Sequence, residues 1–243
     1  MIATPQRPLD LGRSMDAAFA AYRDAFVPLV VAIAVVAVPV QLLTLLPGRG
    51  PVLAEFALET FVVGAITAGL ATRALADLRA GVRPTAGSLW RRVGPGAAVL
   101  IGTVAMVVVT TVLAAFALVV PAILCWVWFQ FSTPVVVIEG RRFASAMGRS
   151  RRLVRGSFWR VLGYIVVAGL LSAVASGLLS GAVTSAGAEF GVSVAGFRVL
   201  RTLTGIAAQV LVQPVGALLI AVLYFDVRLR REGTDLIAML DSL

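Results

Sequence analysis

The sequence predicts an all-α integral membrane protein built as a bundle of six transmembrane helices. The first observation is a run of 46 residues, from Val93 to Ile138, without a charged side chain. A spanning helix needs about 20 apolar residues, so this run has room for two spans and a turn. Pro121 lies near the middle, where it would end one helix and suit the first turn of the next. The run therefore predicts a transmembrane hairpin.

Composition is the second observation. Of 243 residues, 60% are hydrophobic and 14% are charged, and the mean hydropathy is +0.98. Soluble domains have about 25% charged residues. All 21 basic residues are arginine, and the formal net charge is +9. Arginines beside membrane spans more often set topology or contact lipid than bind nucleic acid, so no nucleic-acid partner is expected.

Charge-free windows locate the spans. The six predicted spans are residues 26–46, 58–75, 97–119, 122–138, 161–184 and 203–225. The second is the shortest, and it crosses the membrane only if Glu59 and Arg73 reach outward to the two interfaces.

The distribution of arginine is the third observation. With six spans and a cytoplasmic N-terminus, 18 of the 21 arginines fall in cytoplasmic segments, and only Arg49, Arg198 and Arg201 fall outside. This split follows the positive-inside rule. Removing the second span would export the five arginines from Arg73 to Arg92. The sequence thus predicts a multi-pass protein of the bacterial plasma (inner) membrane with both termini in the cytoplasm.

Short amphipathic segments precede the first, third and fifth spans. In residues 10–26, apolar side chains recur at three- and four-residue spacing opposite charged ones, and residues 143–159 repeat this pattern. A shorter version, TAGSLWRRV, precedes the third span. We expect these segments to be cytoplasmic helices lying in the membrane interface, each introducing one of three transmembrane hairpins.

Each even-numbered span ends in an acid, any residue and an arginine. The three pairs are Asp77 and Arg79, Glu139 and Arg141, and Asp226 and Arg228. The entries to the first and fifth spans also align, as YRDAF and VRGSF. These matches share one phase, which indicates an interfacial helix and two spans repeated three times.

Three segments carry a family resemblance: RPLDLGRSMDAAFAAYRDAF, VVVIEGRRFASAMGRSRRLVRGSFWRVLG and LYFDVRLRREGTDL. They resemble actinobacterial members of the glycerophosphoryl diester phosphodiesterase membrane-domain family. The resemblance implies a six-helix membrane domain, which in some bacteria is fused to a soluble phosphodiesterase domain. That catalytic domain uses histidines and metal-binding carboxylates, and this chain has no histidine. The resemblance therefore implies membrane architecture without activity, and it supplies no site residues.

The strongest local feature is an arginine cluster before the fifth span. Its candidate contacts to anionic lipid of the inner leaflet, or to a partner protein, are Arg149, Arg151, Arg152, Arg155 and Arg160. Each arginine near an anionic surface contributes about 1 kcal/mol. The alternative is that the cluster only fixes topology.

Polar side chains inside the spans form a second candidate group. Gln130 and Gln213 are expected near the membrane midplane, and Gln209 lies one turn from Gln213 on the same helical face. Pro214 frees a backbone carbonyl that needs a partner. Interhelical hydrogen bonding is the favoured interpretation, and a polar substrate path is the alternative.

Two further features lie at the opposite side of the membrane or within the fifth span. Glu55 and Glu59 share a helical face and could bind a cation or act as acid and base. The alternative is that these carboxylates only reach outward to the membrane interface. Arg198 and Arg201 lie on the same side of the membrane and could be their partners. The fifth span carries Gly169, Ala173, Gly177 and Gly181, which favours close packing within the bundle, with self-association as the alternative.

No phosphate loop, zinc motif or nucleophile motif is present, so no cofactor, metal or catalytic residue is predicted. The leading hypothesis is a non-catalytic membrane module that binds lipid or partner proteins. The alternatives are a small-solute transporter or channel using the glutamine region, and a membrane-embedded enzyme acting on lipid at the outer carboxylates.

Overall fold

The structure, a computed structural model, describes residues 10–45 and 57–241. All regular secondary structure in these residues is helical. In chain order the elements are α1 (Leu11–Asp24), α2 (Phe26–Leu42), η1 (Leu43–Leu45), η2 (Leu58–Gly64), α4 (Ala65–Arg79), α5 (Ala86–Val93), η3 (Gly94–Gly96), α6 (Ala97–Ala117), α7 (Val119–Trp128), α8 (Ser132–Glu139), α9 (Phe143–Val154), α10 (Phe158–Glu189), α11 (Val194–Ala207), η4 (Ala208–Val212) and α12 (Gln213–Asp241).

Five continuous helical segments in the described residues are long and apolar enough to cross a membrane. They are Leu58–Arg79, Ala86–Ala117, Val119–Glu139, Phe158–Gly187 and Val194–Glu232. The helices α1 and α2, bent by 78° relative to each other, together make a sixth candidate. The predicted all-helical class is confirmed, and the described residues contain five to six span-capable helices where six spans were predicted.

The predicted helix boundaries differ from the observed ones at several ends. The break between the third and fourth spans falls at Leu118, and Pro121 lies in the first turn of α7. The first span ends as an α-helix at Leu42, four residues before its predicted end, and residue 46 lies outside the described part. The fifth helix is longer than predicted, because α10 includes Phe158 and Trp159 before its apolar run.

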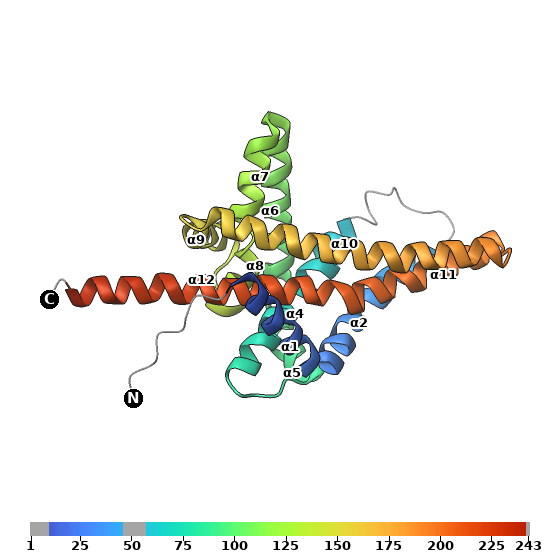
Figure 1. The fold of residues 1–243 in the computed structure, drawn as a ribbon, viewed down its shortest axis with the longest axis horizontal. Helices are drawn as coiled ribbons and strands as arrows, with labels where there is room; N and C mark the ends of the chain where they lie inside the picture. The colour runs from blue at the N-terminus through green and yellow to red at the C-terminus, as the bar shows by residue number, and fades with distance from the viewer. Residues whose placement is uncertain (1–9, 46–56, 242–243) are drawn as a thin grey trace.

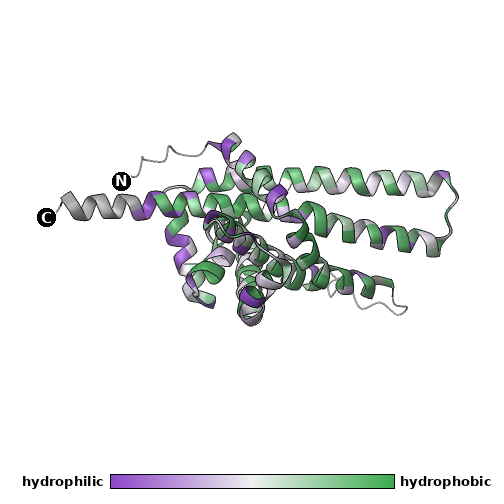
Figure 2. Ribbon diagram, turned by 90° about the horizontal axis from the view of Figure 1, so that it is seen from below, coloured by the Kyte–Doolittle hydropathy of each residue, from purple (hydrophilic) through white to green (hydrophobic). Residues whose placement is uncertain are grey.

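The long helices do not form a single parallel bundle. Figure 1 shows α10 and α12 running side by side along the length of the molecule, while α6 and α7 point away from both. At the tip of this pair, Phe116 is 85% exposed and Val119 is 70% exposed. In a bilayer, the hydrocarbon tails of the lipids are as apolar as these side chains. The hydrophobic effect therefore does not pack the exposed end of α6 and α7 against the other helices. Figure 2 shows hydrophobic residues predominating along the long helices.

Each even-numbered span contains an irregular segment. The second begins with the π-helical η2, the fourth breaks between α7 and α8, and the sixth contains the π-helical η4. Pro134 and Pro214 lie just after the last two irregular segments, and each lacks the N–H that a regular helix would use. The carbonyl oxygen of Leu211 accepts a hydrogen bond of 2.8 Å from the Tyr22 hydroxyl. A hydroxyl on α1 thus provides a partner beside the proline.

The short helix α1 packs through small residues. On α1, Ser14, Ala18 and Ala21 are buried, and the Ser14 hydroxyl lies 2.8 Å from the Tyr164 hydroxyl of α10. The larger apolar side chains of the same helix point outward, with Phe19 48% exposed and Leu11 37% exposed. On α5, the Trp90 indole donates a 3.0 Å hydrogen bond to the Ala32 carbonyl. Helix α1 therefore presents apolar surface outside the protein core, whereas α5 uses Leu89, Val93 and Trp90 to pack against it.

The small-residue stripe of the fifth span does not pack inside the protein, contrary to the favoured prediction. A Cβ atom built on Gly169, Gly177 or Gly181 would meet nothing within 4 Å, and Ala173 is exposed. The reason is that α10 contacts α12 through another face, which includes Tyr164, Ile165 and Ala168. Self-association through this stripe remains a prediction.

Candidate functional site

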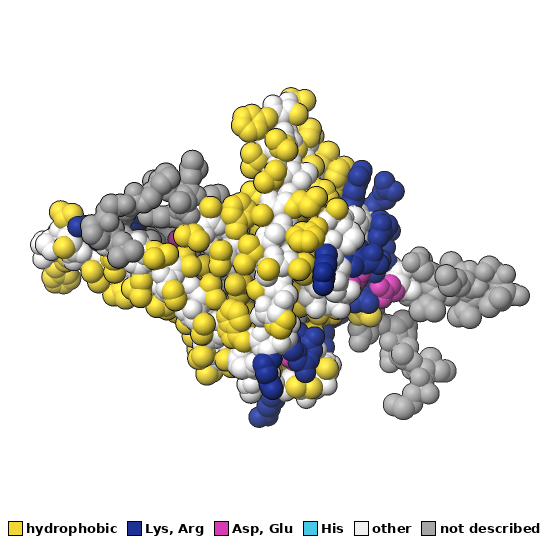
Figure 3. All heavy atoms as spheres, turned by 180° about the vertical axis from the view of Figure 1, so that it is seen from behind, with side chains coloured by type: hydrophobic (Ala, Val, Ile, Leu, Met, Phe, Trp, Pro, Cys, Tyr) yellow, Lys and Arg dark blue, Asp and Glu magenta, His cyan; other side chains and the backbone are white. Residues whose placement is uncertain are grey.

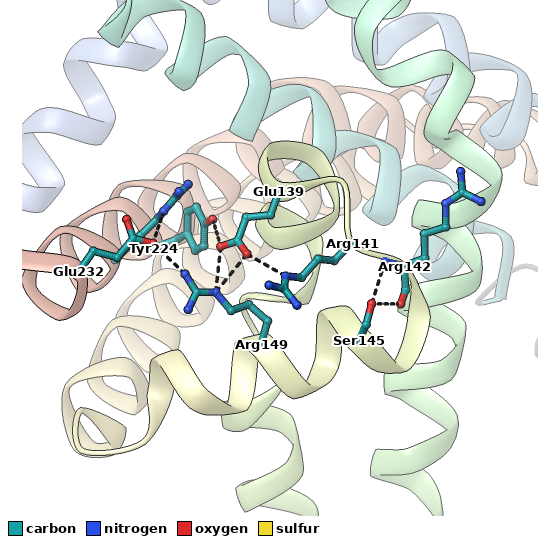
Figure 4. A network of polar contacts seen from close by, with 8 residues as sticks. Glu139, Arg141, Arg142, Ser145, Arg149, Tyr224 and Glu232 are labelled. Atoms are coloured by element: carbon teal, nitrogen blue, oxygen red, sulfur yellow. Dashed lines mark hydrogen bonds and ion pairs between the residues drawn. The ribbon is translucent and has the colours of Figure 1, made fainter. Parts of the chain in front are cut away.

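Glu139 is the centre of a polar network at the end of α8 (Figure 4). Gly140 takes a left-handed conformation with φ of +66°, which ends the helix and turns the chain toward α9. Arg149 of α9 then places its Nε atom 3.1 and 3.0 Å from the two carboxylate oxygens of Glu139. Arg141 Nε lies 3.1 Å from Oε2, and the Tyr224 hydroxyl donates to Oε1 at 3.0 Å. Every oxygen of this carboxylate is therefore engaged.

The network continues into α12. Arg149 Nη2 lies 2.8 Å from Glu232 Oε1, and Arg228 Nε donates to the same oxygen at 2.9 Å. The side chain of Arg149 is 23% exposed and that of Glu139 is 10% exposed. Charge-assisted hydrogen bonds of this length are about twice as strong as neutral ones. The network joins the end of α8 to the middle of α9 and of α12.

The other two acids of the repeat are also paired. Asp77, with a side chain 3% exposed, lies 2.7 Å from Arg73 Nη2 and 3.1 Å from Arg92 Nη1 of α5. Arg230 Nη2 lies 2.9 Å from Asp226 Oδ2. Arg73 was predicted to reach an interface, but it pairs with Asp77 one turn away. Asp77 and Glu139 thus share one arrangement, in which an arginine of the following short helix neutralises the acid at a span's end.

The arginines of the repeat have different partners. Arg141 pairs with its own acid, Glu139, whereas Arg228 pairs with Glu232. The guanidinium of Arg79 lies over the ring of Phe225, 4.5 Å from its centroid. Asp77 and Glu139 lie at the ends of α4 and α8, whereas Asp226 lies within α12, and the three arginines make different contacts.

The five candidate lipid-binding arginines separate into three kinds. Arg149 is held in the Glu139 network, and Arg151 lies 4.4 Å above the centroid of Trp128. Arg152, Arg155 and Arg160 are exposed and have no acidic partner among the described residues. Figure 3 shows arginine side chains gathered beside a wide hydrophobic surface. We call Arg152, Arg155 and Arg160 the free arginines.

The three glutamines are not one cluster. Gln130 and Gln213 line a cavity of about 550 Å³ between α4, α6, α7, α8, α10 and α12, which we call the glutamine cavity. Gln209 is buried elsewhere, at 5% exposure, whereas Gln213 is exposed. Gln209 does not line the glutamine cavity, so only two of the three predicted glutamines share it.

A second cavity, of about 420 Å³, lies where α10 turns into α11. We call it the far-end cavity. It is lined by Gln41, Glu59, Ser180, Val183, Thr184, Phe197, Arg198, Arg201, Thr202, Thr204, Gly205 and Ala208. The structure thus brings Arg198 and Arg201 to the same cavity as Glu59, while Glu55 lies outside the described residues. Gln41 donates a 2.8 Å hydrogen bond to Glu59 Oε1.

Sequence reasoning missed several of these residues. Gln41 is one of two polar side chains in the predicted first span, which is the signal that could have found it. Tyr224 lies two residues before Asp226 in a span, and Ser150 lies among the arginines of α9. The neighbouring sequence does not indicate that Tyr224 contacts Glu139 or that Ser150 contacts the break between α7 and α8. Both contacts join segments that are distant in the sequence. In the described residues, no group of three His, Cys, Asp or Glu side chains could hold a metal ion.

Residues 60–227 match the family model of a domain of unknown function, DUF7847. The chain belongs to the DUF7847 family. None of the curated proteins and none of the solved structures matches it. The DUF7847 region contains Asp77, Glu139 and Asp226, and so all three acids at the span ends. The similarity to the glycerophosphoryl diester phosphodiesterase membrane-domain family remains a prediction.

Proposed function

We propose that this DUF7847 protein is a non-catalytic membrane module whose arginine-rich face binds anionic lipid of the inner leaflet or a partner protein. It would lie in a bacterial plasma membrane as three hairpins, each introduced by an interfacial helix, with both termini in the cytoplasm. The observation that supports this is the contrast between the free arginines and their neighbours. Asp77, Glu139, Asp226 and Glu232 are already paired with other arginines. The charges of Arg152, Arg155 and Arg160 are therefore available to another molecule.

The position of the free arginines fits a lipid surface. Trp159, beside Arg160, is 80% exposed, and tryptophan is typical of membrane interfaces. Arg149 is not part of the proposed surface, because its charge is used by Glu139 and Glu232. Its replacement would disturb the fold as well as binding.

The test replaces two free arginines, Arg152→Gln with Arg155→Gln. At about 1 kcal/mol per arginine near an anionic surface, affinity for anionic lipid should fall roughly thirtyfold. Mass spectrometry of phospholipids and proteins that co-purify in mild detergent measures the loss. The matched control is Arg83→Gln with Arg91→Gln, which removes the same charge from two other exposed arginines. Unchanged lipid and partner content, or equal losses in both double variants, would reject the proposal.

The glutamine cavity favours a second candidate, a path for a small solute. Its volume of about 550 Å³ and the two amides of Gln130 and Gln213 on its wall suit a polar occupant. If the cavity is filled with water, Gln213→Cys in a Cys125→Ser background should react with a membrane-impermeant thiol reagent. Val109→Cys, on the outward face of α6, is the control and should stay unmodified. Absence of reaction at Gln213→Cys would remove this candidate.

A further inference from the structure

The far-end cavity lies at the opposite end of the molecule from the arginine-rich face. Ser180 and Thr184 are near the last residue of α10, whereas Arg160 is near its first. Of the twelve lining residues, eight have polar or charged side chains. Three of these are charged: Glu59, Arg198 and Arg201. A cavity this polar between apolar helices needs a chemical explanation, since isolated charges there are costly.

The charges in this cavity are separated rather than joined. Gln41, only 6% exposed, satisfies one oxygen of Glu59. Arg198 and Arg201 are exposed and form no ion pair with Glu59 or any other described acid. A structural salt bridge would bring these groups into contact. The arrangement instead presents one carboxylate and two guanidinium groups to a common space, which suits a ligand that has both charges.

The backbone around the cavity is irregular on two sides. Glu59 belongs to the π-helical η2, and Ala208 belongs to the π-helical η4. Such segments occur frequently at functional sites. At Gly205, a Cβ atom would lie 2.9 Å from Gln41 Oε1, so α11 approaches the amide closely only because this residue is glycine. The fold thus holds Gln41 against Glu59.

We propose that the far-end cavity binds a phosphoethanolamine group, with the phosphate on Arg198 and Arg201 and the ammonium on Glu59. Guanidinium groups match phosphate geometry, and a primary ammonium can donate hydrogen bonds to the carboxylate. The volume of about 420 Å³ is in the range of small-ligand sites. Leu178 and Leu203 leave apolar surface exposed on α10 and α11, which acyl chains of a phospholipid could cover.

The test uses the full chain in nanodiscs of phosphatidylcholine that contain a minority of phosphatidylethanolamine. Native mass spectrometry counts the lipids retained by the protein. The wild type should retain phosphatidylethanolamine in preference to phosphatidylcholine, whose quaternary amine cannot donate a hydrogen bond. Glu59→Gln should reduce this preference about tenfold, as loss of one charge-assisted hydrogen bond implies. Arg198→Gln with Arg201→Gln should reduce retention of both lipids.

Three further experiments distinguish the outcomes. Gly205→Ala changes no charge but displaces Gln41, and it should weaken the preference in a protein that remains monodisperse. Soluble phosphoethanolamine added as a competitor separates the sources: displacement indicates the free zwitterion, and no displacement indicates the lipid headgroup. Arg152→Gln with Arg155→Gln should leave the preference unchanged, so a failure here is separate from a failure at the arginine-rich face. No preference in the wild type, or full preference in Glu59→Gln, would overturn the proposal.

Discussion

Glu139→Gln should lower the free energy of unfolding by about 2–3 kcal/mol. Removing one partner of a fully buried ion pair costs about 3–5 kcal/mol, and the effect here is smaller because Arg149 is partly exposed and keeps Glu232. The variant removes the charge that Arg141 and Arg149 share, and it weakens the acceptor of the Tyr224 hydroxyl. Equilibrium unfolding in mixed micelles measures the change.

Glu189→Gln is the matched control, since Glu189 is an exposed acid at the far end of α10 and should change stability little. The pair Glu139→Gln and Arg149→Gln should together cost less than the sum of the single variants, because the two residues contact each other. Equal effects of Glu139→Gln and Glu189→Gln would show that the network does not stabilise the fold.

Ser150→Ala should also destabilise the protein, by about 2–6 kcal/mol. Ser150 is fully buried on α9, and its hydroxyl donates to the Trp128 carbonyl at 2.7 Å and accepts from the Phe131 amide at 3.0 Å. Removing the hydroxyl leaves two backbone groups without a partner at the break between α7 and α8, at about 1–3 kcal/mol for each. Unfolding in mixed micelles gives the free energy, and hydrogen exchange at the Phe131 amide should become faster.

Ser185→Ala is the control for this prediction. Its hydroxyl is exposed and bonds to the Ala182 carbonyl within its own helix, so water can replace it. If Ser150→Ala leaves both stability and exchange at Phe131 as in Ser185→Ala, the hydroxyl does not maintain the broken span.

Several features of the fold could be predicted because their cause is local. Absence of charge over 46 residues located α6 and the α7–α8 segment, and Pro121 lies in the first turn of α7, close to its expected role. The short helices before α2, α6 and α10 follow from the spacing of apolar residues. The acids at the span ends were found by their position in a repeat.

The candidate sites were predicted less well, because they depend on contacts between distant residues. Arg149 is chemically the same as Arg152 in the sequence, yet one is bound in a network and the other is exposed. Gln209 and Gln213 were predicted to form one group, but Gln213 lines the glutamine cavity and Gln209 is buried outside it. Gln41 and Glu59 meet across a hydrogen bond that no spacing rule predicts.

The sequence by itself determined which segments are apolar, how long they are and at which end the arginines gather. Those properties follow from side-chain chemistry alone. The thickness of the bilayer sets the length of an apolar helix, and the positive-inside rule sets the side of the arginines, whichever helices lie next to them. Only the tertiary structure decided which arginines are neutralised, where helices break and which polar groups share a cavity. Helices in an apolar surrounding gain little from burial, so a few hydrogen bonds and ion pairs between distant residues set their arrangement.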